Sequence, residues 1–419
     1  MIRAHRAAAA LLAAALLAPA ATACASAEGA PAVGAPTGRA SAAAVSNRAD
    51  RLSVPRPTGR WPVGRDTLQL TDEKRRDPWV PSAGPRRLMA SVFYPARHGG
   101  GRGAGARYLS VREAELLLKG LKLDAAFPAD RLASVRTNAR TGARPAAGKH
   151  PLIVLSPGFS LHRATLTTLA EELSSHGYVV AVLDHAYESF GTTFTGPAGR
   201  RTLTCVACET VEDEPDDEEE KKRLARAARD RAADISFVVD RLTDAGKGVR
   251  SGAGRGSARW AALIDPRHIG AAGHSLGGNA AAVAAGADRR IRAAANLDGT
   301  FFAPVPRADL GRPTLMLGTR KGHTPHAADA TWPRTWQRLH GWKRWLTVAG
   351  SGHFTFIDLP ILGGQAGVTD PEAPLSGKRS GEITTRYVTA FFDRQLRGRA
   401  RPLLDGPSRE NPEVDFHTP

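Results

Sequence analysis

A glycine-rich turn between two apolar runs constrains the fold of this chain more than any other feature. The run His268 to Ser275 predicts a buried strand, and the Ala-rich run Gly278 to Gly286 predicts a helix. Between them, residues 273–277 read Gly-His-Ser-Leu-Gly. A serine on a sharp strand-to-helix turn has a strained backbone, and glycines two positions before and after it remove side chains that would collide there. This context predicts that Ser275 is a nucleophile.

Further runs of the same kind predict the rest of the fold. Apolar runs typical of strands occur at Arg87–Tyr94, Pro151–Ser156, Gly177–Asp184, Arg292–Gly299, Pro313–Thr319 and Lys343–Gly350. Apolar residues recur at helical spacing in Ala164–Ser175 and in Ile383–Leu396. Strands that alternate with helices predict an α/β fold, with a mostly parallel, doubly wound sheet covered by helices on both faces.

Two insertions interrupt this alternation. The first, His98 to Gly148, is rich in Gly and Arg and has one predicted helix, Val111 to Leu121. The second, Ala186 to Asp217, leads into an acidic run with nine Asp and Glu residues between Glu209 and Glu220. We expect this run to be a solvated charged loop, because the turn glycine of a calcium loop is absent. A helix is predicted from Lys221 to about Asp244.

The N-terminus has the features of an export signal. Residues 1–25 combine a basic start, an Ala/Leu run and a small-residue end, which predicts a signal peptide and a secreted, extracellular protein. Ordinary cleavage is expected, and lipidation of Cys24 is the alternative. Residues 26–57 lack periodicity and predict a flexible leader. We expect one catalytic domain over 58–405 and a C-terminal tail over 406–419.

The two other cysteines form a Cys-x-x-Cys pair inside the second insertion. In an oxidising compartment, Cys205 and Cys208 are expected to form a local disulfide rather than a redox-active pair. A zinc site would need two more ligands at suitable spacing, and none is nearby. We therefore expect no metal and no cofactor.

Composition excludes several classes of protein. Lys and Arg total 58 and Asp and Glu total 41, which gives a formal net charge of +17. The Arg residues are scattered, without the aromatic-interleaved basic stripe of a nucleic-acid binder, so no nucleic-acid partner is expected. After residue 25, no apolar run approaches the ~20 residues that a membrane-spanning helix needs.

A serine nucleophile needs a base, and His353 is the best placed candidate. It lies in the loop Gly-Ser-Gly-His at 350–353, just after a predicted strand. A histidine on such a late loop can reach over the nucleophile, in the chain order Ser, acid, His. The competing residues are His323, His326 and His340, which fall in a polar loop or a helix and are expected at the surface.

Two carboxylates compete for the role of the acid that orients the base. Asp298 follows a predicted strand directly, and catalytic groups gather at the carboxyl ends of strands in such sheets. Asp329 is the runner-up, because the loop after the following strand has no earlier carboxylate. A turn-capping role is the non-catalytic alternative for Asp298.

The oxyanion of an acyl-transfer intermediate needs at least two hydrogen-bond donors. The backbone N–H of Leu276, directly after the nucleophile, is the first expected donor. The second is the backbone N–H of Phe159, in the loop Ser-Pro-Gly-Phe-Ser at 156–160 after an early strand. Gly158 allows this loop to turn closely.

Four segments together resemble a known family. They are Leu155–His185, Gly273–Gly278 (GHSLGG), Asn296–Phe302 (NLDGTFF) and Gly350–Pro360 (GSGHFTFIDLP). They resemble the platelet-activating-factor acetylhydrolase family of the plasma, lipoprotein-associated type, whose members are serine esterases with the α/β-hydrolase fold.

By position, the resemblance implies that Ser275 is the nucleophile, Asp298 the acid and His353 the base, with Phe159 and Leu276 forming the oxyanion hole. It also implies calcium-independent hydrolysis of short or oxidised acyl esters, including the sn-2 ester of phospholipids.

The expected partner is therefore a small-molecule ester or a phospholipid, with transient contact to a lipid surface. The second insertion is polar and acidic and lacks the apolar docking helices of the animal enzymes. The alternatives are a cutinase-like or polyester-hydrolase-like enzyme, a general lipase, a peptidase on the same fold and a catalytically inactive secreted binding protein. Cutinase-like enzymes place their acid one strand later.

Overall fold

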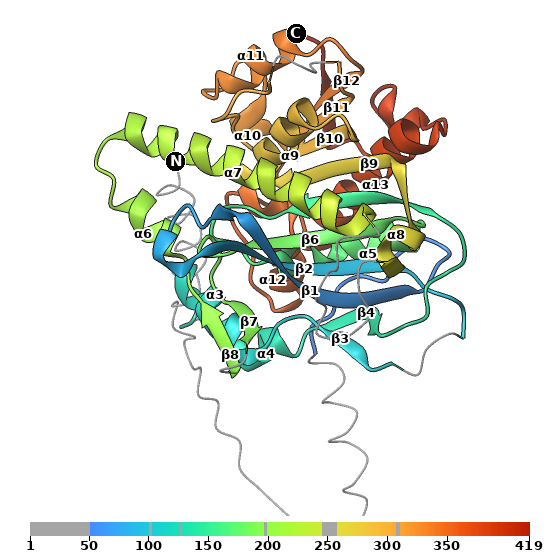
Figure 1. Cartoon of the computed structure of the whole chain (residues 1–419). Helices are drawn as coiled ribbons and strands as arrows, with labels where there is room; N and C mark the ends of the chain where they lie inside the picture. The colour runs from blue at the N-terminus through green and yellow to red at the C-terminus, as the bar shows by residue number, and fades with distance from the viewer. Residues whose placement is uncertain (1–50, 100–102, 126, 197–198, 245–257, 307–310) are drawn as a thin grey trace, which may run out of the picture.

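The computed structural model of the chain describes residues 51–99, 103–125, 127–196, 199–244, 258–306 and 311–419. The predicted signal peptide and most of the predicted leader lie outside these residues. Helices cover a large twisted sheet on both faces (Figure 1). No helix in the described ranges is long and apolar enough to cross a membrane.

Eleven of the strands form one sheet. The strands of the structure are β1 (Val63–Arg76), β2 (Pro85–Pro95), β3 (Gly105–Arg107), β4 (Arg136–Thr141), β5 (His150–Ser156), β6 (Val179–His185), β7 (Thr192–Gly196), β8 (Gly199–Leu203), β9 (Ile264–His274), β10 (Ile291–Leu297), β11 (Thr314–Thr319), β12 (Lys343–Val348) and β13 (Val414–His417). Their order is β13-β12-β11-β10-β9-β5-β6-β2-β1-β4-β3, and β7 pairs with β8 as a separate antiparallel ribbon. Six adjacent central strands, β12-β11-β10-β9-β5-β6 in sheet order, are parallel to one another.

The helices divide between the two faces of the sheet. They are α3 (Val111–Gly120), α4 (Ala129–Ala133), α5 (Thr167–Ser175), α6 (Val206–Glu212), α7 (Asp217–Thr243), α8 (Ala258–Leu263), α9 (Leu276–Ala287), α10 (Arg320–His323), α11 (Thr331–Arg338), α12 (Asp358–Gln365) and α13 (Gly377–Arg397). Helices α7 and α9 pack together on one face, whereas α5 and α13 pack together on the other (Figure 1). The predicted doubly wound α/β fold is confirmed.

Burial explains why the central strands are continuous apolar runs. Leu152, Ile153, Val154 and Leu155 of β5 are each 0% exposed, so both faces of the strand are covered. Helix α9 is buried from Leu276 to Gly286. Its small Ala side chains allow it to pack closely against both the sheet and the neighbouring α7.

The predicted boundaries of the catalytic domain are wrong at both ends, because the folded domain extends further in each direction. Leu52 and Val54 of the predicted leader are buried, and the backbone of Val54 donates to the carbonyl oxygen of Arg136. The predicted tail over 406–419 contributes β13, which pairs antiparallel with β12 and completes one edge of the sheet. Apolar contacts at these positions come from distant parts of the chain.

The acidic run is not the solvated loop that the sequence predicts. Helix α6 covers its first residues, and α7 begins at Asp217 instead of Lys221. Asp216 caps α7, because its side chain accepts hydrogen bonds from the N–H groups of Glu218 and Glu219. Carboxylates in the first turn also favour helix formation through the helix dipole.

Both predicted insertions contain more regular structure than expected. The first holds β3, α4 and β4 besides the predicted helix, and β4 pairs with β1. The second holds the β7–β8 ribbon and α6.

Candidate active site

Ser275 lies on a strained turn between β9 and α9. Its φ of 55° and ψ of −127° place it in a region that side chains rarely adopt. A Cβ at Gly277 would collide with the carbonyl oxygen of Ser156, and one at Gly273 would collide with Gly277. The glycines flanking the serine therefore allow the close contact that the sequence motif predicts.

His353 and Asp298 lie together next to this turn. Nδ1 of His353 is 2.6 Å from Oδ2 of Asp298, and the imidazole N–H donates to the carboxylate. His274 supports the loop that carries His353, because its Nε2 lies 2.7 Å from the backbone carbonyl oxygen of His353. The structure thus brings the two side chains together as the sequence predicts, at the carboxyl ends of β10 and β12.

Asp298 is held by several donors. Its Oδ1 accepts from the backbone N–H of Thr319 at 2.7 Å and from Nδ1 of His323 at 2.7 Å. Burial alone would raise the pKa of Asp298. The charge of His323 and the hydrogen bonds from His323 and His353 outweigh burial and hold this pKa well below its usual range.

The prediction that His323 lies at the surface is wrong. It is 6% exposed, and its Nε2 lies 3.2 Å from Oδ2 of Asp329, the runner-up acid. His326 and His340 are exposed, as expected. The polar loop around His323 gave no periodicity from which burial could be inferred, although its position directly after β11 was a usable signal.

The two predicted oxyanion segments also lie against each other. A Cβ at Gly277, one residue after Leu276, would reach the carbonyl oxygens of Ser156 and Pro157. The loop that carries Phe159 therefore contacts the first turn of α9. Ser160 fixes the far side of this loop, because its N–H donates to the carbonyl oxygen of Glu188 at 3.0 Å.

Comparison with known proteins agrees with this geometry. The sequence profile of the platelet-activating factor acetylhydrolase, isoform II, family matches residues 118–395. The chain belongs to this family. It is a carboxylic ester hydrolase of the platelet-activating factor acetylhydrolase family with the α/β-hydrolase fold.

Individual relatives cover different parts of the chain. A probable 1-alkyl-2-acetylglycerophosphocholine esterase of Arthroderma benhamiae is 27% identical, over 89% of this chain and 96% of its own length. The platelet-activating factor acetylhydrolase of Cavia porcellus is 23% identical over 59% of this chain and 58% of its own length. The structure of a ferulic acid esterase from Streptomyces cinnamoneus is 41% identical, with a TM-score of 0.74, over 88% of this chain and 99% of that one.

In this acetylhydrolase-family chain, a buried network of charges holds the loop of Phe159. Nη1 of Arg231 lies 2.7 Å from the carbonyl oxygen of Pro157, and Nε of the same side chain lies 2.7 Å from Oε2 of Glu188. Arg86 bonds the other oxygen of Glu188 at 2.6 Å. Sequence reasoning missed these residues, because arginine and glutamate are usually exposed.

A second hydrogen-bonded Ser, His and Asp set lies within the same network. Oγ of Ser156 is 2.9 Å from Nε2 of His185, and Nδ1 of His185 is 2.7 Å from Oδ2 of Asp234. All three residues are 0% exposed. Substrate has no access to them, so the role of this set is structural. Its hydrogen bonds tie β5, β6 and α7 together.

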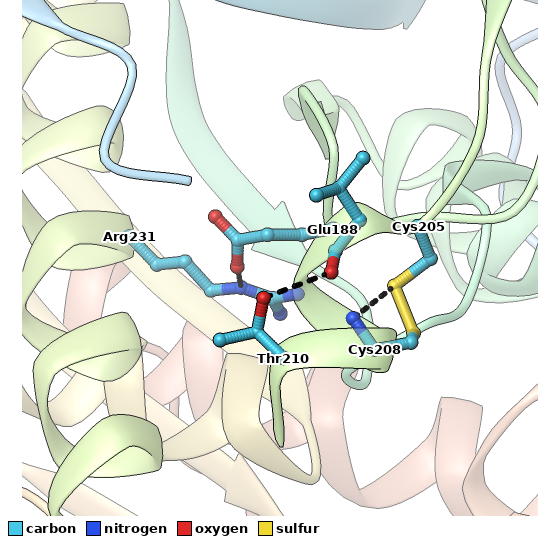
Figure 2. Close-up of a disulfide and its surroundings, with 6 residues drawn as sticks. Glu188, Cys205, Cys208, Thr210 and Arg231 are labelled. Atoms are coloured by element: carbon cyan, nitrogen blue, oxygen red, sulfur yellow. Dashed lines mark hydrogen bonds and ion pairs between the residues drawn. A yellow bond between two sulfur atoms is a disulfide. The ribbon is translucent and has the colours of Figure 1, made fainter. Parts of the chain in front are cut away.

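The predicted cysteine pair lies beside this network. Cys205 and Cys208 have their sulfur atoms at bonding distance and their Cα atoms 5.2 Å apart (Figure 2). The turn that they form begins α6, and its Ala207 N–H donates to the carbonyl oxygen of Tyr187, next to Glu188. The cysteine turn therefore supports the segment that fixes Ser160.

An apolar cavity of about 140 Å³ lies beside the histidine loop. Gly352 and Phe354, on either side of His353, line it. Its other apolar walls come from α3, α4, α12 and the segments beside them, and include Leu118, Leu121, Phe127, Leu132, Leu359 and Leu362. Within the described part of the chain, no three or more His, Cys, Asp or Glu residues form a group that could hold a metal ion.

Proposed function

We propose that this chain is an exported serine esterase that hydrolyses short or oxidised acyl esters through Ser275, His353 and Asp298. The contact of 2.6 Å between His353 Nδ1 and Asp298 Oδ2, beside a serine on a strained strand-to-helix turn, is the observation that carries the proposal. The N-terminal residues 1–25 support export by their signal-peptide pattern.

In this proposal, Nε2 of His353 takes the proton of Ser275 as Oγ attacks the ester carbonyl carbon. Asp298 holds the ring in the tautomer with hydrogen on Nδ1 and stabilises the imidazolium that forms. The N–H groups of Phe159 and Leu276 stabilise the oxyanion. The intermediate expels the alcohol, which takes the proton from His353. Water then hydrolyses the acyl-enzyme by the same steps.

The proposed substrate is the sn-2 ester of phospholipids that resemble platelet-activating factor. The family and the Arthroderma benhamiae relative support this class of substrate. The apolar cavity beside His353 offers a place for the apolar part of an ester, and access to such lipids would involve transient contact with a lipid surface.

A second candidate is an ester of ferulic acid. The Streptomyces cinnamoneus esterase, at 41% identity, supports it. A cavity lined by Leu, Ile and Phe with a volume of about 150 Å³ binds benzene. The cavity beside His353 has about this size and a lining rich in Leu with Phe127 and Phe354, so it suits one aromatic ring.

A substrate panel separates these candidates. We would measure kcat/KM for p-nitrophenyl esters from acetyl to palmitoyl, for an sn-2 acetyl phosphocholine lipid and for methyl ferulate. The phospholipid proposal requires the acetyl lipid to exceed methyl ferulate, and the reverse order would favour the second candidate. Titration with a fluorophosphonate that fails to label Ser275 would favour a binding protein.

A matched pair of variants tests the cavity. Leu359→Trp fills it, so kcat/KM for the longer or aromatic esters should fall more than kcat/KM for acetyl esters. Val111→Trp is the control, because Val111 is 50% exposed on α3 and does not line the cavity. Equal losses on all esters in Leu359→Trp would contradict the assignment.

Export is tested separately. Expression in a secreting host should give a protein in the medium whose intact mass lacks about the first 25 residues, as for cleaved signal peptides. A diacylglyceryl mass on Cys24 would instead identify a lipoprotein.

A further inference from the structure

His323 is a second histidine on the same carboxylate as His353. Its Nδ1 lies 2.7 Å from Oδ1 of Asp298, and its Nε2 lies 3.2 Å from Oδ2 of Asp329. A carboxylate only accepts hydrogen bonds, so each ring nitrogen must carry a hydrogen. This arrangement is that of an imidazolium between two carboxylates.

The ring of His323 is fixed in place by its surroundings. It stacks on Trp332 with ring centroids 4.2 Å apart and an angle of 26° between the planes. The indole N–H of Trp345 donates to the backbone carbonyl oxygen of His323 at 2.7 Å. A Cβ at Gly318 would come within 2.9 Å of the His323 Cβ. His323 therefore has little freedom to leave Asp298.

The charged groups that face the ring are Asp298, from the turn after β10, and Asp329, from the loop before α11. The basic residues of its own helix point elsewhere, because Arg320 pairs with Asp415 and Lys321 with Glu372. Trp332 of α11 and Trp345 of β12 supply the uncharged walls. Burial would lower the pKa of His323, but Asp298 and Asp329 outweigh it and raise this pKa to about 9.

We propose that His323 is a positioning residue that holds Asp298 towards His353 and, through its own charge, tunes how strongly Asp298 stabilises a protonated His353. This inference rests on the proposed roles of Ser275, His353 and Asp298. With Oδ1 held by His323 and by the Thr319 N–H, only Oδ2 remains directed at His353. The cation on the far side of the carboxylate opposes a second positive charge on His353.

Two substitutions separate position from charge. His323→Asn retains an N–H donor near the place of Nδ1 and removes the charge, whereas His323→Leu removes both. His326→Asn is the matched control, since His326 is exposed in the same loop. For each variant we would measure kcat and KM across pH with a soluble p-nitrophenyl ester, together with thermal unfolding.

In His323→Asn, the acid limb of kcat/KM should move to higher pH by about one unit, because a unit charge within several ångströms has been removed. In His323→Leu, kcat at the pH plateau should fall by about 10²-fold with little change in KM, because Asp298 loses its alignment. His326→Asn should match the wild type in both.

An acid limb that stays in place in folded His323→Asn would overturn the proposal and leave His323 a structural role only. If the variants fail to fold, NMR of the wild type decides. The ring resonances of His323, assigned through their contacts to Trp332, should show both nitrogens protonated at pH 7.5, and a neutral ring would refute the proposal. Turnover that survives Ser275→Ala would instead refute the proposed function, whatever His323 does.

Discussion

Replacing Asp298 with Asn tests the proposed triad sharply, because the structure decides how the amide must lie. Oδ1 of Asp298 accepts from the Thr319 backbone N–H at 2.7 Å, and that group can only donate. The amide oxygen must therefore take the place of Oδ1, and the NH₂ group must face His353. His353 would then place its hydrogen on Nε2, where it cannot take the proton of Ser275.

The expected loss follows from this wrong tautomer. Where a catalytic imidazole is held in the wrong tautomer, kcat falls by about 10⁴-fold. This fall corresponds to the loss of about 5.5 kcal/mol of transition-state stabilisation. Folding should be affected less. The substitution keeps the side-chain volume and the Thr319 contact, and it weakens one charge-assisted hydrogen bond from His323, at a cost of about 1–3 kcal/mol.

The measurement is steady-state kcat on p-nitrophenyl acetate, with circular dichroism to confirm folding. Asp329→Asn is the matched control, since its carboxylate contacts His323 and Thr331 but lies beyond Asp298 and His323 along the hydrogen-bonded chain from the base. It should retain kcat within about tenfold. A loss below about tenfold in Asp298→Asn, or a larger loss in Asp329→Asn, would refute the assignment and favour the cutinase-like alternative.

Three further predictions use other parts of the chain. Ser275→Ala should abolish turnover without unfolding, and adding His353→Ala should cost little more, because triad members act as a unit; clearly multiplicative losses would contradict this. The double variant Cys205→Ser, Cys208→Ser should keep nearly the wild-type Tm, because so short a loop removes little chain entropy, while KM changes more for bulky esters than for acetyl esters. Two free thiols in exported protein would end the disulfide interpretation. Burial and, to a smaller extent, the charge of Glu171 raise the pKa of Asp358 to about 7 from its ordinary 3.8. Because the fold favours the protonated form, stability should be lost as pH rises from about 4 through 7, by up to about 4 kcal/mol. Asp358→Asn should remove this dependence in urea unfolding at pH 4.5 and 8, and an unchanged dependence would contradict it.

The sequence predicts the central part of the fold well for a physical reason. Strands buried on both faces must be continuous apolar runs, so Pro151–Ser156 and Pro313–Thr319 nearly coincide with β5 and β11. The turn at Ser275 can also be predicted from the sequence, because its strained backbone requires glycine at fixed positions. The contact of Asp298 with His353 agrees with the choice of Asp298 over Asp329.

Edges and buried charges were not predictable in this way. Strand β1 carries polar residues along much of its length, and β13 is only four residues long, so neither shows a strong apolar pattern. Leu52 and His323 become buried only through contacts with distant segments. A single sequence gives no sign of such contacts, because nothing near these residues in the chain requires them.

The same difficulty applies to the loop of Phe159, whose support comes from three distant segments. Arg231 lies in α7, Glu188 follows β6, and Arg86 lies in β2, yet all are fully buried and share hydrogen bonds that end on the carbonyl oxygen of Pro157. A buried charge is costly unless every partner is in place, so this set forms only when those segments have come together. The insertion that looks like a surface excursion in the sequence therefore supplies part of the wall behind the proposed oxyanion hole. Its cysteine turn holds the residue next to Glu188, because the N–H of Ala207 donates to the carbonyl oxygen of Tyr187. The short motif around Ser275 predicts the chemistry, whereas residues without any motif give the loop opposite it a defined shape.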